Sequence, residues 1–262
     1  MDKHEYKASR MESKDNNQKK NNSNMSIPRK LLLIFFIVCF LVSGFQIAKW
    51  LIETSKTENE YKDLATQVAI GDVNLEEGRV IDFEKLKEIN SETVGWIKID
   101  NTTINYPIVR TDNNEYYLKR NFYKESSVSG AIFADCRNTK TLVDKNIVVY
   151  GHNMKNGSMF ADLTDLYQGK LGKDITVNIY TEQKQLDFKV FSCYNTEPDE
   201  YSLNTSITES NYDKFITNLK NRSEQVFDTN PMNSNQVLTL STCSNNGNNR
   251  IIVHAALQNV NI

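Results

Sequence analysis

The sequence predicts a mainly β protein: an eight-stranded, closed or nearly closed barrel, preceded by N-terminal helices and one transmembrane helix. Eight short β-patterned runs with turn residues between them follow one another closely from Val94 onward. One amphipathic helical stretch separates the sixth run from the seventh. A long apolar run lies near the N-terminus. Closely spaced short strands favour a barrel over a parallel sheet, in which long crossovers separate the strands.

Composition and charge restrict the class of protein. The chain has 262 residues and 39% hydrophobic content, enough for one sizeable core. Its formal net charge of −2 argues against a nucleic-acid-binding protein. Residues 1–30 carry eight Lys or Arg and four Asp or Glu, a net charge of +4, so the remainder carries −6. Because this basic segment is polar and lacks apolar periodicity, it is predicted to be a disordered tail.

The apolar run over residues 31–52 has no charged residue up to Ile47. As a helix it would span about 33 Å at roughly 1.5 Å per residue, which matches a membrane. A cleaved signal peptide is the competing interpretation, but its apolar region is typically about 7–15 residues and precedes a small-residue cleavage site that this sequence lacks. Arg29 and Lys30 flank the run, so the positive-inside rule predicts a single-pass membrane anchor with a cytoplasmic N-terminus and an extracytoplasmic remainder.

Residues 53–92 are polar and contain helix formers with spaced apolar positions, as in TENEYKDLATQVAIG and IDFEKLKEIN, with a break at Gly71. They predict helices that form a stalk or a packed cap ahead of the barrel, which occupies residues 93–262. The eight predicted strands are VGWIKID, INYPIVRT, GAIFAD, NIVVYGH, DITVNIYT, QLDFKVFSCY, QVLTLSTC and RIIVHAAL.

The stretch ESNYDKFITNLKNRS predicts the helix between strands six and seven. Ser210 and Asp213 resemble a capping box at its start. Weaker patterns in NEYYLKR and MFADLTDLY predict short helical turns. The apolar residues of the helix recur at i, i+3, i+4 and i+7, namely Tyr212, Phe215, Ile216 and Leu219.

The four cysteines do not fit a small disulfide scaffold. Cys39 lies in the predicted anchor, which leaves Cys136, Cys193 and Cys243 outside it. At least one of these three thiols is therefore free or pairs with another molecule. A disulfide between Cys136 and Cys193 stays open. The sequence has no C-x-x-C pair and no His/Cys cluster with ligand spacing, so no metal site is predicted.

Cys243 is the candidate nucleophile because it stands where a β-patterned run ends, and loops after strands are where reactive groups meet substrate. A cysteine nucleophile needs a basic partner that populates its thiolate, and histidine is the usual one. Among three histidines, His4 lies in the tail, His152 lies at a strand end, and His254 lies within a strand. His152 is the better candidate, and His254 is the alternative base.

Arg250 opens the last run, after the loop SNNGNN. If the two runs are antiparallel neighbours, the loop brings Arg250 beside Cys243, where the guanidinium can stabilise an oxyanion. Each residue also has a simpler interpretation: Cys243 as a packed thiol, His152 as a loop histidine bonded to backbone, and Arg250 as a surface charge.

Together, the TLSTC that ends one strand, the arginine that opens the next and the upstream YGHN resemble the sortases, the membrane-anchored cysteine transpeptidases of Gram-positive bacteria. The N-terminal anchor and the count of eight strands agree with this family. The helix between strands six and seven, with helices ahead of the barrel, resembles the class B branch. The resemblance covers roughly residues 60–262.

The resemblance implies that Cys243 is the nucleophile, His152 its acid/base partner, and Arg250 the group that binds substrate and oxyanion. It also implies that Thr242 and Ser241 help to bind substrate beside the cysteine. Tyr201 and Leu203 are implied substrate-binding residues along a groove ahead of the inserted helix.

The implied substrates are surface proteins with a C-terminal sorting motif, cut after a threonine and transferred to an amine of a peptidoglycan precursor or cross-bridge, without metal or cofactor. One departure is Asn245, where some class B members carry an acidic residue. Three alternatives remain: a pilin-polymerising sortase that uses a pilin lysine, a catalytically silent peptide-binding surface protein, and a thiol hydrolase that releases its acyl group to water.

Overall fold

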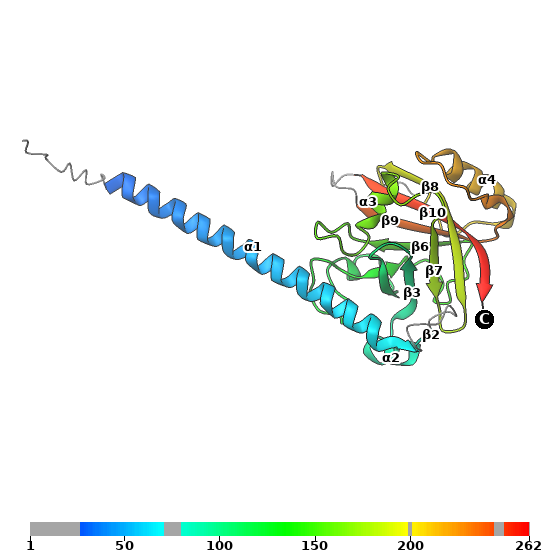
Figure 1. The fold of residues 1–262 in the computed structure, drawn as a ribbon, viewed down its shortest axis with the longest axis horizontal. Helices are drawn as coiled ribbons and strands as arrows, with labels where there is room; N and C mark the ends of the chain where they lie inside the picture. Colours follow the sequence, from blue (N-terminus) through cyan, green and yellow to red (C-terminus); the bar gives the residue numbers. More distant parts are fainter. Residues whose placement is uncertain (1–26, 71–79, 199–200, 244–248, 262) are drawn as a thin grey trace, which may run out of the picture. The chain divides into compact units, whose positions relative to one another are not determined.

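Eight strands form a closed barrel, which confirms the predicted fold class. The computed structural model describes residues 27–70, 80–198, 201–243 and 249–261 (Figure 1). Around the barrel the strands follow the order β10-β8-β7-β3-β4-β5-β6-β9, and β9 pairs with β10 to close it. In chain order the barrel strands are β3 (Thr93–Ile99), β4 (Asn105–Val109), β5 (Ile132–Ala134), β6 (Asn146–Gly151), β7 (Thr176–Tyr180), β8 (Gln185–Thr196), β9 (Val237–Cys243) and β10 (Arg250–Asn261).

Most neighbouring strands are antiparallel, but β6 and β9 run parallel, as do β4 and β5. A parallel pair needs a long crossover, and the chain between β6 and β9 passes through β7, β8 and the helix α4 (Glu209–Asn221). The parallel register runs from Asn146 opposite Val237 to Gly151 opposite Thr242. The C-terminal ends of β6 and β9 therefore lie side by side at one edge of the barrel.

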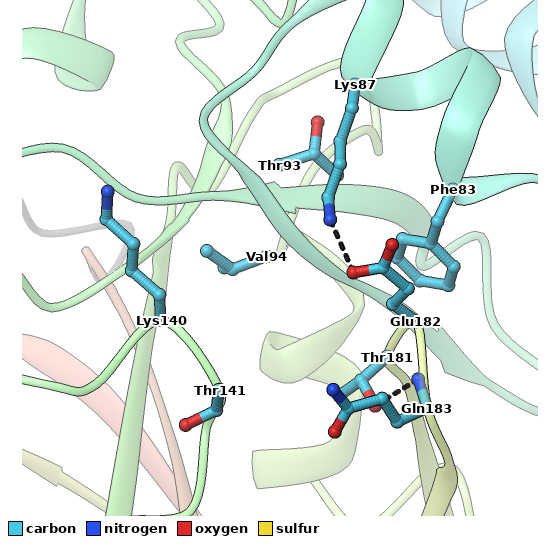
Figure 2. Close-up of a pocket in the computed structure, with 9 residues that line it drawn as sticks. All are labelled: Phe83, Lys87, Thr93, Val94, Lys140, Thr141, Thr181, Glu182 and Gln183. Carbon is cyan, nitrogen blue, oxygen red and sulfur yellow. Dashed lines mark hydrogen bonds and ion pairs between the residues drawn. The ribbon is translucent and has the colours of Figure 1, made fainter.

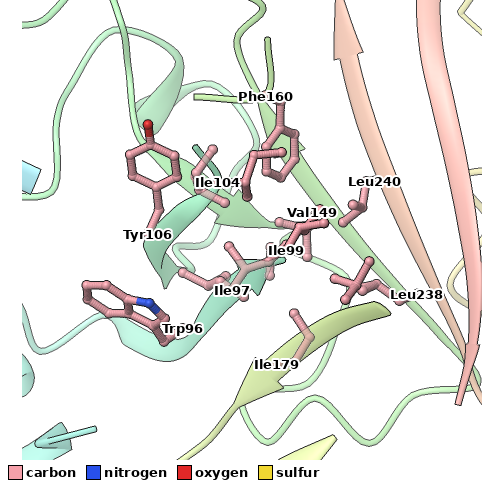
Figure 3. Close-up of a cluster of buried hydrophobic side chains, with 14 of the residues drawn as sticks. Trp96, Ile97, Ile99, Ile104, Tyr106, Val149, Phe160, Ile179, Leu238 and Leu240 are labelled. Carbon is pink, nitrogen blue, oxygen red and sulfur yellow. The ribbon is translucent and has the colours of Figure 1, made fainter. Parts of the chain in front are cut away.

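The apolar side chains of β8, β9 and β10 divide between two hydrophobic clusters. In β9, Leu238 and Leu240 belong to the main cluster, while Val237 belongs to a second cluster with residues of α4. Figure 3 shows the two leucines of β9 in the main cluster with Val149 of β6 and Ile179 of β7. Full burial of such a side chain stabilises the fold by roughly 1.5–3 kcal/mol. This gain fixes the side of the sheet that each alternating position occupies.

Helix α4 lies between β8 and β9, the sixth and seventh barrel strands, as predicted (Figure 1). Its predicted capping box is wrong. Thr208, in an extended conformation, precedes the first turn, and no side-chain hydrogen bond caps the helix. The Ser210 hydroxyl instead pairs with that of Thr208 at 3.1 Å. The four periodic apolar residues are all buried, namely Tyr212, Phe215, Ile216 and Leu219.

Short elements complete the domain. The predicted helical turns are present as η1 (Tyr116–Leu118) and α3 (Asp162–Tyr167). Elements missed from the sequence are η2 (Pro231–Asn233) and the pair of two-residue strands β1 (Ala69–Ile70) and β2 (Val80–Ile81). Two or three residues are too few to show a periodicity, which explains why they were missed.

In the part of the chain that the structure describes, two α-helices precede the barrel. Helix α2 (Phe83–Ile89) is capped by the Asp82 side chain, which accepts a hydrogen bond from the Lys85 N–H at 2.9 Å. Helix α1 (Ile27–Val68) is continuous through residues 53–68. The predicted break at Gly71 and residues 1–26 of the predicted disordered tail lie outside the described residues. Residues 27–30, predicted as the end of that tail, are instead the start of α1.

The chain divides into two compact units, with the boundary between Ala48 and Lys49. In α1, Ile27–Ile52 is long and apolar enough to cross a membrane. Within the second unit, Tyr61 and Leu64 of the same helix are buried in the main hydrophobic cluster. The hydroxyl of Tyr61 accepts a hydrogen bond from the backbone N–H of Phe122 at 3.0 Å. Residues 61–68 are therefore part of the folded domain and not only a stalk.

Candidate active site

The ends of three strands bring the predicted site residues to one edge of the barrel. In the parallel register of β6 and β9, Gly151 pairs with Thr242, and the next residues along the two strands are His152 and Cys243. On the other side of β9, Arg250 is the antiparallel partner of Cys243. Neighbouring strands lie roughly 4.8 Å apart. The backbone of Cys243 therefore lies between those of His152 and Arg250, while its side chain lies outside the described residues.

The imidazole of His152 is held by a backbone carbonyl. Its Nε2 lies 2.8 Å from the carbonyl oxygen of Leu118, the last residue of η1. Because a carbonyl can only accept, Nε2 carries the hydrogen, and in the neutral ring the remaining lone pair is on Nδ1. The carbonyl of His152 also accepts a hydrogen bond from the N–H of Phe160 at 2.9 Å. The contact with Leu118 therefore sets the tautomer and the orientation of the ring, and the contact with Phe160 holds the backbone of His152.

Two glycines allow the close packing around His152. Gly130 has a φ of +59°, and a Cβ there would lie 3.0 Å from Cδ2 of His152 and 2.6 Å from the carbonyl oxygen of Tyr117. A Cβ on Gly151 would lie 2.5 Å from Cδ1 of Ile132 and 2.7 Å from the ring of Phe160. At each glycine the nearest atom is closer than a real Cβ contact allows. Gly130 therefore leaves room for the His152 ring, and Gly151, which precedes His152 in the chain, leaves room for Ile132 and Phe160.

Arg250 lines an open cavity of about 350 Å³ at this edge of the barrel. Leu118, whose carbonyl holds His152, lines the same cavity. Among the described residues, the lining combines one cation with apolar and uncharged polar side chains, namely Asn114, Leu118, Phe133, Tyr150, Pro198, Leu203 and Arg250. Such a cavity suits an extended, largely uncharged peptide whose carbonyl oxygens need a donor.

A buried carboxylate supports one side of this cavity. The side chain of Asp135 is fully buried, and its Oδ2 accepts hydrogen bonds from the Tyr150 hydroxyl at 2.7 Å and from Nδ2 of Asn114 at 3.1 Å. Burial alone would raise the pKa of Asp135, but hydrogen bonds from Arg137 and Tyr150 outweigh it and hold the pKa below its ordinary value. Burial and the Asp135 charge raise the pKa of Tyr150, which stays a neutral donor.

Ser241 and Thr242, which precede Cys243, are both buried. Within the described part of the chain, neither hydroxyl oxygen has a hydrogen-bond partner. In the sheet Ser241 is the partner of Tyr150, a cavity residue. A buried hydroxyl without a partner costs roughly 1–3 kcal/mol, so both can gain from a bound donor or acceptor.

The structure separates the two residues predicted from the segment ahead of α4. Leu203 lines the cavity with Arg250. Tyr201 packs against α4 instead: its ring centroid is 5.7 Å from that of Phe215, and its hydroxyl accepts a hydrogen bond from Nδ2 of Asn218 at 2.6 Å. Tyr201 lines two shallow hollows against α4 and does not line the cavity beside Arg250.

His254, the alternative base, is fully buried within β10. Its Nε2 lies 2.9 Å from the hydroxyl of Tyr194, and its Nδ1 lies 2.9 Å from that of Thr239. Both ring nitrogens are therefore engaged with side chains of the neighbouring strands, and the histidine at the barrel edge is His152.

The other cysteines outside the apolar helix have no disulfide. Cys136 and Cys193 are free thiols, which settles the pairing that the sequence left open. Burial raises the pKa of the Cys193 thiol, so Cys193 is unreactive as a nucleophile. Among the described residues, no group of three or more His, Cys, Asp or Glu is arranged to hold a metal ion.

A smaller pocket of about 60 Å³ lies elsewhere on the domain (Figure 2). Figure 2 shows Lys87 of α2 paired with Glu182 across it, beside Phe83 and Thr93. It contains neither histidine nor cysteine, so it offers no nucleophile and base pair.

Sequence reasoning missed several residues of the cavity and its support. Asn114 and Leu118 lie in the predicted helical turn NEYYLKR, and Asp135 is the last residue of the predicted strand GAIFAD. No spacing pattern connects them to Cys243 or Arg250, because they approach the site only through the pairing of β4, β5 and β6. The acidic residue that follows a buried strand in IFAD was the one local hint at Asp135.

Comparison with known proteins agrees with this architecture. The family model of the sortase domain matches residues 97–258. Sortase B of Listeria monocytogenes is 32% identical over 228 residues, which cover 82% of this chain and 89% of that protein. A Staphylococcus aureus sortase B–substrate complex has a TM-score of 0.69 at 28% identity and covers 79% of this chain and 98% of that one. A sortase B complexed with triglycine has a TM-score of 0.63 at 26% identity and covers 82% and 98%.

Proposed function

Because this chain belongs to the sortase family, as a class B sortase, we propose that it is a membrane-anchored cysteine transpeptidase that joins surface proteins to the cell wall. In this function it cleaves a C-terminal sorting motif after a threonine and transfers the acyl group to an amine. The observation that carries the assignment is the register at the barrel edge, where the backbone of Cys243 lies between His152 and Arg250.

The reaction begins when Nδ1 of His152 takes the proton of the Cys243 thiol, and the resulting thiolate attacks the carbonyl carbon of the threonine residue. Arg250 donates hydrogen bonds to the carbonyl oxygen, on which negative charge develops. A donor that is already in position before the reaction stabilises this charge most strongly, because it does not have to reorganise. The C–N bond breaks, and His152 gives its proton to the departing amine. A thioester between Cys243 and the threonine carbonyl results, with the amine fragment released.

The second half transfers the acyl group. An incoming amine attacks the thioester carbonyl and loses a proton to His152, and the C–S bond breaks to regenerate the thiolate. The hydrogen bond to the Leu118 carbonyl supports this role, because it keeps the ring oriented without an acidic third residue. This carbonyl offers an explanation of how the chain can work with Asn245 where some class B members carry an acid; Asn245 itself lies outside the described residues.

The cavity beside Arg250 is proposed as the groove for the sorting motif, with Leu203 as an apolar wall. Ser241 and Thr242, the two residues before Cys243, have buried hydroxyls without a partner among the described residues. They are proposed to form hydrogen bonds with the bound peptide. The Staphylococcus aureus neighbour is a complex with a substrate, which supports a peptide site in this fold. Tyr201 is proposed to contact substrate only beyond the cavity, at the surface of α4.

The acceptor is proposed to be an amine of a peptidoglycan precursor or cross-bridge. The neighbour complexed with triglycine supports a peptide amine as the incoming group. The proposed topology has residues 1–30 in the cytoplasm, residues 31–52 in the membrane, residues 53–92 as connecting helices, and residues 93–262 as the extracytoplasmic catalytic domain. The membrane-length helix over Ile27–Ile52 supports this topology, as do Arg29 and Lys30, which precede its uncharged part.

The test uses the full chain in detergent micelles with a library of quenched sorting-motif peptides and triglycine as the acceptor. We expect cleavage after threonine, a ligated product, and an intact-mass adduct on Cys243 that is absent from Cys243→Ala. The matched control is Cys136→Ala, which removes another free and partly accessible thiol. A folded chain that forms no adduct with any peptide, or an adduct that persists in Cys243→Ala, would contradict the proposal.

A further inference from the structure

Three consecutive carbonyls of residues 202–204, here called the pinned segment, accept hydrogen bonds from side chains of the barrel. Nδ2 of Asn146 donates to the carbonyls of Ser202 at 3.1 Å and Asn204 at 2.9 Å. Nη2 of Arg137 donates to the carbonyl of Leu203 at 2.9 Å. Carbonyls of a surface connection are commonly left to water. Here the backbone on both sides of the Leu203 side chain is fixed by the barrel.

The amide of Asn146 is itself oriented by a buried chain of hydrogen bonds. The Thr239 hydroxyl donates to Oδ1 of Asn146 at 2.7 Å, so that hydroxyl must accept from Nδ1 of His254, 2.9 Å away. His254 therefore carries its hydrogen on Nδ1 and accepts from the Tyr194 hydroxyl with Nε2. Asn146, Thr239 and His254 are all fully buried. With Oδ1 bonded to a donor, Nδ2 of Asn146 must face the pinned segment.

Arg137 is fixed in the same way from the other side. Its Nε and Nη2 form a two-pronged pair with Oδ1 and Oδ2 of the buried Asp135, at 2.8 and 2.7 Å. The same carboxylate holds Tyr150 and Asn114, which line the cavity beside Arg250. A single buried carboxylate therefore connects two cavity residues directly, and a third, Leu203, through Arg137.

We propose that Asn146 and the Asp135–Arg137 pair are positioning residues that determine side-chain selection in the peptide groove. They hold Leu203 as a wall that cannot retract, so the groove accepts or rejects one residue of the peptide by the size of its apolar side chain. A wall of fixed position discriminates single methylene groups by about 10- to 200-fold. This inference rests on the proposed function, because it takes the cavity beside Arg250 as the peptide groove.

The test compares wild type, Arg137→Met, Leu203→Ala and the double variant as full chains in detergent. The peptides differ at one position, in the size of an apolar side chain. We expect Arg137→Met to raise KM for the preferred peptide about tenfold, or about 1.4 kcal/mol, with kcat changed less than about threefold. We also expect it to narrow the preference between large and small side chains. Since Arg137 acts through Leu203, the double variant should be no worse than Leu203→Ala.

Three further variants separate positioning from general stability. Arg137→Lys keeps the charge beside Asp135 but lacks the planar fork, so it should keep the melting temperature and still raise KM. Asn146→Ala should shift KM and the size preference in the same direction as Arg137→Met. Lys170→Met removes an exposed ion pair with Asp165 and touches neither the cavity nor the pinned segment, so KM should stay unchanged.

Additive losses in the double variant would overturn the inference, as would an unchanged size preference in both Arg137 variants. A loss confined to kcat in Arg137→Met would also overturn it, because that pattern indicates a role in the chemical step. A folded wild-type chain that cleaves no peptide would overturn the proposed function itself, and this inference with it. The wild-type control thus separates the two failures.

Discussion

Replacing Gly130 with alanine is expected to displace His152 as well as to destabilise the domain. Gly130 has a φ of +59°, where an L side chain costs roughly 1–2 kcal/mol. The added Cβ would lie 2.6 Å from the carbonyl oxygen of Tyr117 and 3.0 Å from both the Leu118 carbonyl oxygen and Cδ2 of His152. Two of these atoms belong to backbone, so the segment must shift at a further cost of about 1–3 kcal/mol. The free energy of unfolding should fall by about 2–5 kcal/mol.

The matched control is Gly172→Ala. Gly172 also has a positive φ, +85°, but its Cβ would meet nothing within 4 Å. It should therefore lose only the conformational part, roughly 1–2 kcal/mol. Both variants are measured as full chains in detergent, by denaturant unfolding and by kcat/KM on a cleaved sorting peptide. Because the Leu118 carbonyl holds the His152 ring, Gly130→Ala should lower kcat/KM about 10- to 100-fold, while Gly172→Ala should leave it near wild type.

Equal stabilities for the two glycine variants would refute the steric part of this reasoning. If Gly130→Ala is less stable than Gly172→Ala but equally active, the contact between Gly130, Leu118 and His152 does not position the imidazole. That second result would show that the Leu118 carbonyl is not the group that orients His152.

Three further outcomes are expected. Because burial raises the pKa of the Cys193 thiol, iodoacetamide at pH 8 should label Cys136 and leave Cys193 unmodified. Peptide mapping by mass spectrometry measures the labelling of each cysteine. Modification of Cys193 in the native protein would contradict this expectation. Burial opposes the ionised form of Asp135, but hydrogen bonding to Arg137 keeps its pKa in the folded state below the unfolded value. The ionised carboxylate therefore stabilises the fold above about pH 4. This stabilisation is lost as the pH falls through the lower folded pKa. The melting-temperature difference between wild type and Asp135→Asn should therefore be large at pH 6 and shrink towards pH 3, and a difference that is independent of pH would be evidence against the ionised form. His254→Gln should lose about 1–3 kcal/mol of stability from an impaired buried hydrogen-bond chain but keep a kcat close to wild type, whereas a kcat that disappears in a folded variant would return His254 to the role of base.

Local patterns in the sequence were sufficient for the elements and their order. Short runs of β-forming residues separated by turn residues identified all eight barrel strands, even where a strand such as β5 or β6 buries consecutive residues. The recurrence of apolar residues at every third or fourth position identified α4. The apolar run before Lys49 likewise predicted a membrane-length helix from its length alone. The capping box at Ser210 was wrong because Thr208 and Ser210 pair their hydroxyls with each other, which a spacing rule cannot foresee.

Only the tertiary structure decided which strand ends meet. His152 approaches the backbone of Cys243 through the parallel pairing of β6 and β9, across a long crossover that leaves no local sequence pattern. The pairing of β5 with β6 brings Asp135 to Tyr150, and the fold brings Asn146 to residues 202–204, although neither residue carries a motif. Hydrophobic periodicity is set by contacts between near neighbours in the chain, whereas hydrogen bonds of buried polar groups depend on which distant segments the closed barrel brings together. The candidate nucleophile could therefore be predicted from the chain alone, and the groups that orient its partners could not.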